Sequence, residues 1–303
     1  MMDGREEAVP VTIDLDQFPA QVGKLIEACE ALGCFRVINH KIPVQLMSEM
    51  KSIVRNLFDL PTETKRRNTD TIVSSGYVEP TPKYPLYEAL GFYGSNLFEA
   101  VDAFCGQLDV TVHQRETIKT YAHEVHNLAM EIGHKIAQGL GVEGDLCREW
   151  PIQFKINKYS FTKKTLGSPG IQLHTDSGFL TVLQEDECVG GFQVMDKSSR
   201  FIPVDPIAGS FLVNLGDVAK AWSNGRFCNA KHRVQCIEPG IRLTITVFIL
   251  GPKEEMVEVP PELVDVDHPR LYLPFDYQDY RKRRISMGQV AGEALELYTI
   301  QNA

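Results

Sequence analysis

The second half of the chain consists of short β-rich runs separated by turns, and this pattern constrains the fold more than any other feature. The turns are marked by sequences such as Ser168-Pro169-Gly170, Asn224-Gly225 and Pro239-Gly240. The β-rich runs span residues 152–161, 171–174, 179–184, 191–195, 200–204, 210–214, 231–238 and 241–249. Many short strands at regular spacing predict an all-β sandwich or barrel.

The first half of the chain has mainly helical character. Apolar residues recur with helical spacing, above all in the long stretch of residues 111–140. Further helices are expected at residues 17–32, 43–58, 61–66 and 278–300, and short strands at residues 11–15 and 34–39. We therefore predict a mixed α+β chain in which helices flank a β core at both ends.

These regions are predicted to form one structural unit. Residues 1–110 form a helix and strand region that packs on the core, residues 111–150 hold the long helix, residues 151–255 form the core, and residues 256–303 form a helical tail. Residues 70–96 are rich in Gly, Pro, Ser and Tyr and lack a sustained periodicity. We predict a long irregular segment there, of the kind that often serves as a binding loop or lid.

Charge and cysteine usage exclude several classes of protein. The 303 residues carry a net charge of −9, which argues against a nucleic-acid partner. No apolar run is long enough to span a bilayer, and the N-terminus lacks the apolar core of a secretory signal. The seven cysteines are scattered without a C-x-x-C pair, which favours reduced thiols and a cytoplasmic location. The basic run of residues 281–284 is interpreted as a solvated helix end, and the oligomeric state stays open.

Two histidines and an aspartate have the spacing of a metal site. His174 and Asp176 lie at the end of a β-rich run, where side chains at i and i+2 share one face, and His232 begins a later run. Two imidazoles and one carboxylate with three open positions form the facial triad of non-haem Fe(II) oxygenases. An isolated H-x-D pair is more often a surface turn, so the metal interpretation depends on His232.

A buried arginine is expected on the strand that follows His232. Arg242, Thr244, Thr246 and Phe248 share one face of the run at residues 241–249. An arginine that points into a core needs an anion, and its planar guanidinium fits a carboxylate in a bidentate manner. A dicarboxylate such as 2-oxoglutarate needs such a clamp at its far end. The alternative is a structural arginine paired with a protein carboxylate.

A third run contributes polar residues to one face. Lys155, Asn157 and Tyr159 alternate with Phe154 and Ile156. The polar face is expected to line a pocket while the apolar face packs in the core. The alternative is a strand with a solvated face.

Together these motifs resemble those of the plant 2-oxoglutarate/Fe(II)-dependent dioxygenases over roughly residues 10–300. The matching pieces are Ile13-Asp14-Leu15, residues 33–40, Phe58-Asp59-Leu60-Pro61, Asn157-x-Tyr159, His174-x-Asp176, residues 214–217, Trp222-Ser223-Asn224-Gly225, His232 and Arg242-x-Thr244. The resemblance implies a double-stranded β-helix, or jelly-roll, core with flanking N-terminal and C-terminal helices. It also implies Fe(II) as cofactor, 2-oxoglutarate and O2 as co-substrates, and ascorbate as an activator.

The resemblance also assigns roles to residues of the core. Asn157 and Tyr159 would join Arg242 and Thr244 around 2-oxoglutarate. The usual family motif is Arg-x-Ser, whereas this chain has Arg-Leu-Thr. The hydroxyl is retained, and the additional methyl group would narrow the pocket.

Within the family, residues 86–91 and the tail from residue 268 to residue 293 are most similar to the dioxygenases for auxin oxidation. This implies oxidation of indole-3-acetic acid to 2-oxoindole-3-acetic acid, with succinate and CO2 as co-products. An indole acid needs aromatic walls and a cation. The candidates are Phe248 and Lys155, and less directly Phe161, Tyr77, Tyr84 and Tyr87. A salt bridge elsewhere for Lys155, and packing roles for the aromatic residues, are the alternatives.

Other functions on the same scaffold stay open from the sequence. A hydroxylase or desaturase of another small plant metabolite, such as a gibberellin or flavonoid, would use the same motifs. A catalytically inactive module that binds a small acid, or a cupin-like metal isomerase or structural metal protein, would not turn over 2-oxoglutarate.

Overall fold

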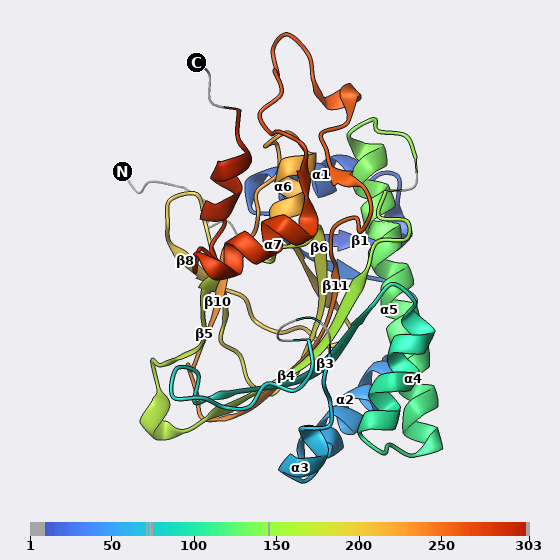
Figure 1. Cartoon of the computed structure of the whole chain (residues 1–303), viewed down its shortest axis with the longest axis vertical. Coiled ribbons are helices and arrows are strands. Elements are labelled where there is room, and N and C mark those ends of the chain that lie inside the picture. Colours follow the sequence, from blue (N-terminus) through green and yellow to red (C-terminus); the bar gives the residue numbers. More distant parts are fainter. Residues whose placement is uncertain (1–9, 71, 73–74, 145, 301–303) are drawn as a thin grey trace.

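Two β-sheets form the centre of the computed structural model, which describes residues 10–70, 72, 75–144 and 146–300 (Figure 1). The larger sheet has the order β1 (Thr12–Asp14), β2 (Cys34–Ile38), β9 (Phe211–Leu215), β6 (Leu180–Glu185), β11 (Gly240–Ile249), β4 (Ile152–Phe161) and β3 (Tyr87–Gly94). The smaller sheet has the order β5 (Pro169–His174), β10 (His232–Gln235), β7 (Phe192–Met195) and β8 (Phe201–Pro203). Only the β1–β2 pairing within these two sheets is parallel.

Eight of these strands form the predicted jelly-roll core. Strands β9, β6, β11 and β4 belong to the larger sheet, and β5, β10, β7 and β8 make up the smaller one. The N-terminal strands β1 and β2 extend the larger sheet at one edge, and β3 extends it at the other. The mixed α+β class with a double-stranded β-helix is therefore confirmed.

Helices cover the outer face of the larger sheet. They are α1 (Val22–Ala31), α2 (Val44–Phe58), α4 (Leu97–Gln107) and α5 (Val112–Gly139), with α5 in contact with the other three and with β6 and β11. A reciprocal capping box between Thr111 and Gln114 starts α5. Its apolar face, which includes Ile118, Val125 and Ile132, is fully buried against the sheet and the neighbouring helices. The predicted helix at residues 111–140 thus forms because capping and periodicity agree.

The remaining elements are short. They are α3 (Thr62–Lys65), α6 (Asp217–Trp222), α7 (Tyr277–Ser286), the two-stranded sheet of β12 (Met256–Val257) and β13 (Phe275–Asp276), and the 3-10 helices η1 (Leu15–Gln17), η2 (Lys163–Thr165), η3 (Pro261–Leu263) and η4 (Glu293–Tyr298). Helix α7 lies across one open end of the two sheets (Figure 1). Within the described residues, no helix has the length and apolarity required to cross a membrane.

One expectation for the N-terminal region is wrong. The segment of residues 70–96 was expected to be irregular, but its last part forms β3, which pairs with β4 over its whole length. The run contains Ala89 and Gly91, so the sequence has no period-two pattern. Gly91 is required because a Cβ there would lie 2.3 Å from the carbonyl oxygen of Phe154 on β4. Residues 71, 73 and 74 of this segment lie outside the described residues.

Candidate metal centre and co-substrate site

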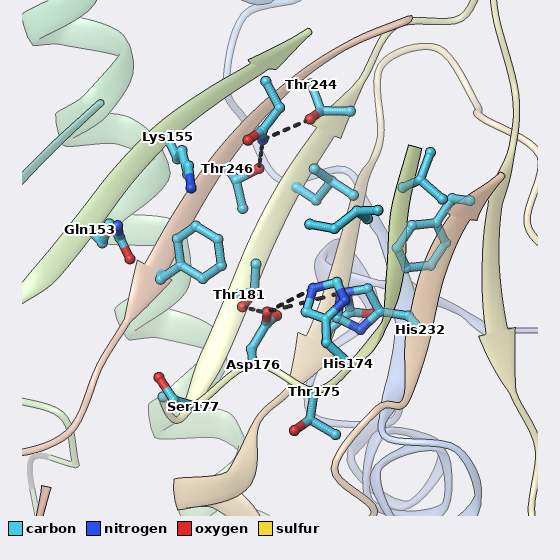
Figure 2. Close-up of a pocket in the computed structure, with 18 of the residues that line it drawn as sticks. Gln153, Lys155, His174, Thr175, Asp176, Ser177, Thr181, His232, Thr244 and Thr246 are labelled. Atoms are coloured by element: carbon cyan, nitrogen blue, oxygen red, sulfur yellow. Dashed lines mark hydrogen bonds and ion pairs between the residues drawn. The ribbon is translucent and has the colours of Figure 1, made fainter. Parts of the chain in front are cut away.

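A cavity of about 270 Å³ lies between the two sheets. The larger sheet contributes side chains from β4, β6 and β11, and the smaller sheet contributes side chains from β5, β7 and β10. Helix α7 adds Arg281, Arg284 and Ile285 at the open end. Figure 2 shows Lys155 and Thr246 on one side of this space and the cluster of His174, Asp176 and His232 on the other. The predicted polar face of β4 therefore does line a pocket.

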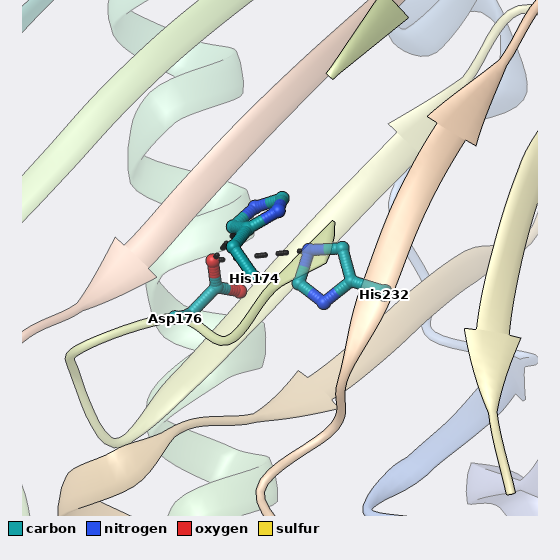
Figure 3. Close-up of side chains that lie close together, drawn as sticks. All are labelled: His174, Asp176 and His232. Atoms are coloured by element: carbon teal, nitrogen blue, oxygen red, sulfur yellow. Dashed lines mark ion pairs between the residues drawn. The ribbon is translucent and has the colours of Figure 1, made fainter. Parts of the chain in front are cut away.

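His174, Asp176 and His232 converge within this cavity (Figure 3). Their nearest ligand atoms all lie within 4.8 Å of one another, and Asp176 Oδ1 is 3.9 Å from Nε2 of each histidine. His174 ends β5 and His232 begins β10, and the two residues are direct partners in the antiparallel register. Pairing of two short strands thus brings together residues that lie far apart in the sequence.

Backbone carbonyls fix the orientation of both imidazole rings. Nδ1 of His174 lies 2.9 Å from the carbonyl oxygen of Gln172, and Nδ1 of His232 lies 3.0 Å from that of Ala230. A backbone carbonyl oxygen can only accept a hydrogen bond, so Nδ1 of each ring is the donor and carries the hydrogen, and Nε2 keeps its lone pair. Burial lowers the pKa of His174, and the neighbouring His232 lowers it further. Both effects favour the neutral ring that a metal requires.

The carboxylate is oriented in the same way. Thr181 on β6 donates its hydroxyl hydrogen to Asp176 Oδ2 at 2.6 Å, which leaves Oδ1 directed toward the histidines. The backbone N–H of Asp217 donates to the carbonyl oxygen of Asp176 at 2.8 Å. Gly216 is required beside this loop, because a Cβ there would lie 2.2 Å from the carbonyl oxygen of Gly178. The donor set of two neutral nitrogens and one carboxylate oxygen fits Fe(II).

Arg242 occupies the position expected for a carboxylate clamp. It lines the cavity from β11, is only 2% exposed, and lies over the Tyr159 ring at 5.4 Å from the centroid. Its Nη2 also donates to Glu185 Oε1 on β6 at 3.0 Å. Arg242 therefore has a protein carboxylate partner, as the alternative interpretation required, and it still faces the cavity.

Two family models match the sequence in chain order. The model described as "non-haem dioxygenase in morphine synthesis N-terminal" matches residues 9–84, and the model of the "2OG-Fe(II) oxygenase superfamily" matches residues 152–251. The rice protein (Oryza sativa) "2-oxoglutarate-dependent dioxygenase DAO" is 53% identical over 276 residues, which cover 91% of this chain and 92% of the rice protein. The chain belongs to the 2OG-Fe(II) oxygenase superfamily.

Solved structures of similar proteins have the same fold as this oxygenase. The crystal structure of the dioxygenase for auxin oxidation from rice superimposes with a TM-score of 0.90 at 51% identity and covers 96% of this chain and 100% of that one. The Arabidopsis thaliana dioxygenase for auxin oxidation 1, in a binary complex with 2-oxoglutarate, gives a TM-score of 0.83 at 49% identity and covers 86% of this chain and 100% of that one.

Asn157 and Thr244 of the oxygenase bind each other. Asn157 Nδ2 donates to Thr244 Oγ1 at 3.0 Å and to Thr246 Oγ1 at 3.3 Å, and Asn157 Oδ1 accepts a hydrogen bond from the Tyr87 hydroxyl at 2.8 Å. The asparagine therefore holds the two threonine hydroxyls in place. Tyr159 lines the cavity next to Arg242, and burial raises the pKa of its hydroxyl, so it stays protonated.

Lys155 is the cation of β4 that faces the cavity. Its Nζ lies 5.6 Å from the centroid of the Tyr87 ring. Burial and, to a smaller extent, the positive charge of Arg281 on α7 together lower the pKa of Lys155 to about 8, while Asp176 opposes the shift. Two cations from different elements thus lie near one part of the cavity, where an anion would be favoured.

The other predicted substrate residues divide into two groups. Phe248 and Tyr87 line the cavity. Tyr77, Tyr84 and Phe161 are not among the cavity-lining side chains: Tyr77 donates to Glu88 Oε1 at 2.7 Å, Tyr84 packs on a separate core cluster, and Phe161 is buried in that cluster at 4% exposure. We therefore leave these three residues out of the proposed substrate site.

The interpretation of residues 281–284 as a solvated helix end is wrong for two of the four residues. Arg281 and Arg284 line the cavity, and Arg284 forms an ion pair with buried Asp217 at 3.3 Å. Arg283 does lie in solvent and pairs with Asp279. Helical spacing of three residues puts Arg281 and Arg284 on one face, and this spacing was the available signal. Thr181 and Glu185 were also missed. Thr181 is only five residues from Asp176 but belongs to the next strand, β6, and Glu185 is 57 residues from Arg242 in the sequence.

Proposed function

We propose that this oxygenase oxidises indole-3-acetic acid to 2-oxoindole-3-acetic acid. The observation that carries the proposal is the 53% identity to the rice dioxygenase over 91% of the chain, together with a cavity that contains every motif residue of the family site. The balanced reaction consumes one O2 and one 2-oxoglutarate for each indole acid. It releases succinate and CO2, and the product gains one oxygen atom.

In this proposal His174, Asp176 and His232 hold Fe(II). Bound iron supplies the redox chemistry that couples decarboxylation of the oxo-acid to oxygen transfer. The chain itself orients the three ligands, through the Gln172 and Ala230 carbonyls and the Thr181 hydroxyl. Ascorbate would keep the iron reduced. The scattered cysteines, which include no C-x-x-C pair, favour reduced thiols and a cytoplasmic location.

The distal carboxylate of 2-oxoglutarate binds to Arg242 in this proposal. Arg242 has five N–H donors, and Glu185 takes only one of them. Thr244 lies two residues along the same strand face, and Asn157 sets the direction of its hydroxyl. Tyr159 forms an aromatic wall beside the guanidinium.

The carboxylate of the indole acid is proposed to bind to Lys155. This lysine points into the cavity from β4, and Arg281 reinforces the positive potential from α7 (Figure 2). Phe248 and Tyr87 line the same cavity and provide aromatic contact for the indole ring. The three proposed metal ligands, His174, Asp176 and His232, lie on the opposite side of the cavity (Figure 2). The ring of an acid held by Lys155 would therefore extend toward these ligands.

The test is an activity assay with matched variants. Protein purified without oxygen is mixed with Fe(II), ascorbate, 2-oxoglutarate and indole-3-acetic acid, oxygen is admitted, and succinate and indole products are measured by mass spectrometry. We expect one succinate for each indole product that is heavier by one oxygen atom, and no product from His174→Ala. Lys155→Met should raise KM for the indole acid, whereas Lys158→Met should not, because Lys158 points to the other face of β4 and pairs with Glu88.

Other outcomes would select the alternatives. Succinate without a change in the indole acid would contradict the auxin assignment, and a panel of gibberellin- and flavonoid-like acids would then be screened. An absence of succinate with every acid, while 2-oxoglutarate still binds, would indicate an inactive binding module.

A further inference from the structure

A second buried arginine lies behind the proposed clamp. Arg36 comes from β2, in the N-terminal region of the chain, and is 4% exposed. It donates to Ser210 Oγ at 2.9 Å and to the carbonyl oxygen of Asp205 at 2.8 Å. These two contacts fix the guanidinium at the edge of the core.

Arg36 and Arg242 share one carboxylate. Glu185 Oε2 lies 3.4 Å from Arg36 Nη2, and Glu185 Oε1 lies 3.0 Å from Arg242 Nη2. The side chains of Arg36 and Glu185 are each 4% exposed, and that of Arg242 is 2% exposed. Arg242 lines the cavity, whereas Arg36 and Glu185 do not. The order from the protein edge to the cavity is therefore cation, anion, cation.

This triad carries one net positive charge in a buried setting. An unbalanced buried charge is costly unless an anion or several hydrogen bonds compensate it. Glu185 shares its negative charge between Arg36 and Arg242, so Arg242 is only partly neutralised. The uncompensated positive charge of Arg242 faces the cavity. The site is thus built to accept one carboxylate.

We propose that Arg36 is a positioning residue that keeps Arg242 available for the distal carboxylate of the oxo-acid. The inference rests on the proposed role of Arg242 in the function above. Arg36 neutralises Glu185, so that Glu185 orients Arg242 without cancelling its charge. Without Arg36, Glu185 alone would neutralise Arg242, and its negative charge would repel the incoming carboxylate.

The test measures binding rather than turnover. Protein loaded with Mn(II) is titrated without oxygen, by calorimetry, with 2-oxoglutarate and separately with 2-oxopentanoate, which lacks the distal carboxylate. For Arg36→Gln we expect the Kd of 2-oxoglutarate to rise about tenfold or more, because a charge is lost in a low-dielectric setting. The Kd of 2-oxopentanoate should change less than about twofold.

Two further variants separate an electrostatic role from a structural one. Arg36→Lys keeps the charge and should retain most of the affinity for 2-oxoglutarate. The double variant Arg36→Gln/Glu185→Gln removes both charges, returns one positive charge to Arg242, and should recover the affinity that the single variant loses. The double variant also tests the proposal if Arg36→Gln alone does not fold.

Several results would overturn the proposal. Unchanged binding of 2-oxoglutarate to Arg36→Gln would do so, and so would an equal loss for both oxo-acids, which would indicate a structural role only. Failure of the double variant to recover affinity has the same meaning. If the unsubstituted protein does not bind 2-oxoglutarate at all, the proposed function itself fails, and the two failures are therefore distinguishable.

Discussion

Each proposed iron ligand is oriented by a hydrogen bond at the side-chain atom that faces away from the metal position. The two histidines use Nδ1 against backbone carbonyls, and Asp176 uses Oδ2 against the Thr181 hydroxyl. The ligand atoms are therefore oriented before a metal arrives, which reduces the entropy lost on binding.

Thr181→Val tests this orientation, because valine keeps the shape of threonine and removes the hydroxyl. We expect metal affinity to fall by about 10–100-fold, since Asp176 then loses the hydrogen bond that directs Oδ1. Equilibrium dialysis against Mn(II) measures the change. His174→Ala should abolish specific binding in the same experiment, and an unchanged Mn(II) affinity in Thr181→Val would exclude the orienting role.

Lys155 predicts a pH dependence for substrate binding. Its pKa is lowered to about 8, first by burial and then by Arg281, so the ammonium group is charged below that pH and neutral above it. The carboxylate of an indole acid stays ionised throughout the neutral and alkaline range. The kcat/KM for the indole acid should therefore be highest below about pH 8 and should fall as the pH rises through that value.

Arginine at the same position provides the control. Lys155→Arg stays charged, so its kcat/KM should not fall between pH 7 and 9. The Lys155→Met variant should have a low kcat/KM throughout this range. An alkaline limb that is identical in all three proteins would assign the titration to another group.

At the level of elements, α7 is attached to the loop that carries Asp176. Arg284 donates to the carbonyl oxygen of Thr175 and, at 2.6 Å, to that of Val290. It also pairs with Asp217, which accepts hydrogen bonds from Tyr280 at 2.5 Å and from Asn229 at 2.7 Å. One buried carboxylate thus connects α6, α7 and the metal loop.

Arg284→Met removes the cation of this network. Asp217 is fully buried, and it would keep only its two hydrogen bonds to Tyr280 and Asn229. We expect the free energy of unfolding to fall by about 3 kcal/mol, measured by urea denaturation. Arg283→Met, one position earlier on the solvent side of α7, should leave stability nearly unchanged. Equal stability of the two variants would contradict the proposed attachment.

At the level of the whole molecule, the site connects the two sheets. His232 belongs to the smaller sheet, Arg242 belongs to the larger sheet, and Asp176 lies on the loop that leads from β5 to β6. Ligands that bind only this assembled arrangement stabilise the folded state.

Mn(II) and 2-oxoglutarate together should therefore raise the Tm. At free concentrations of about one hundred times Kd, one bound ligand adds about 2.7 kcal/mol to the free energy of unfolding. Scanning calorimetry without oxygen measures the shift. His232→Ala should lose the effect of both ligands, and Arg242→Met should lose mainly the effect of 2-oxoglutarate. A Tm that does not depend on either ligand would argue against binding between the sheets.

The sequence by itself determined which residues form the core strands and which chemistry they carry. The β-rich run of residues 152–161 matches β4, and the predicted shared face of Lys155, Asn157 and Tyr159 lines the cavity. These properties are local: a period of two places alternate side chains on one face, and donor types follow from residue identity. The metal triad could be proposed because its members are chemically distinctive at a recognisable spacing.

Tertiary structure alone decided which partners those residues have. Glu185 and Arg36 come from separate strands, yet they set the charge next to Arg242. Strand β3 exists because it pairs with β4, although its own sequence lacks alternation. Arg281 and Arg284 of α7 reach the cavity only because the helix packs across the open end of the sheets. Such contacts join residues far apart in the chain, so their energies leave no periodic pattern in any local segment.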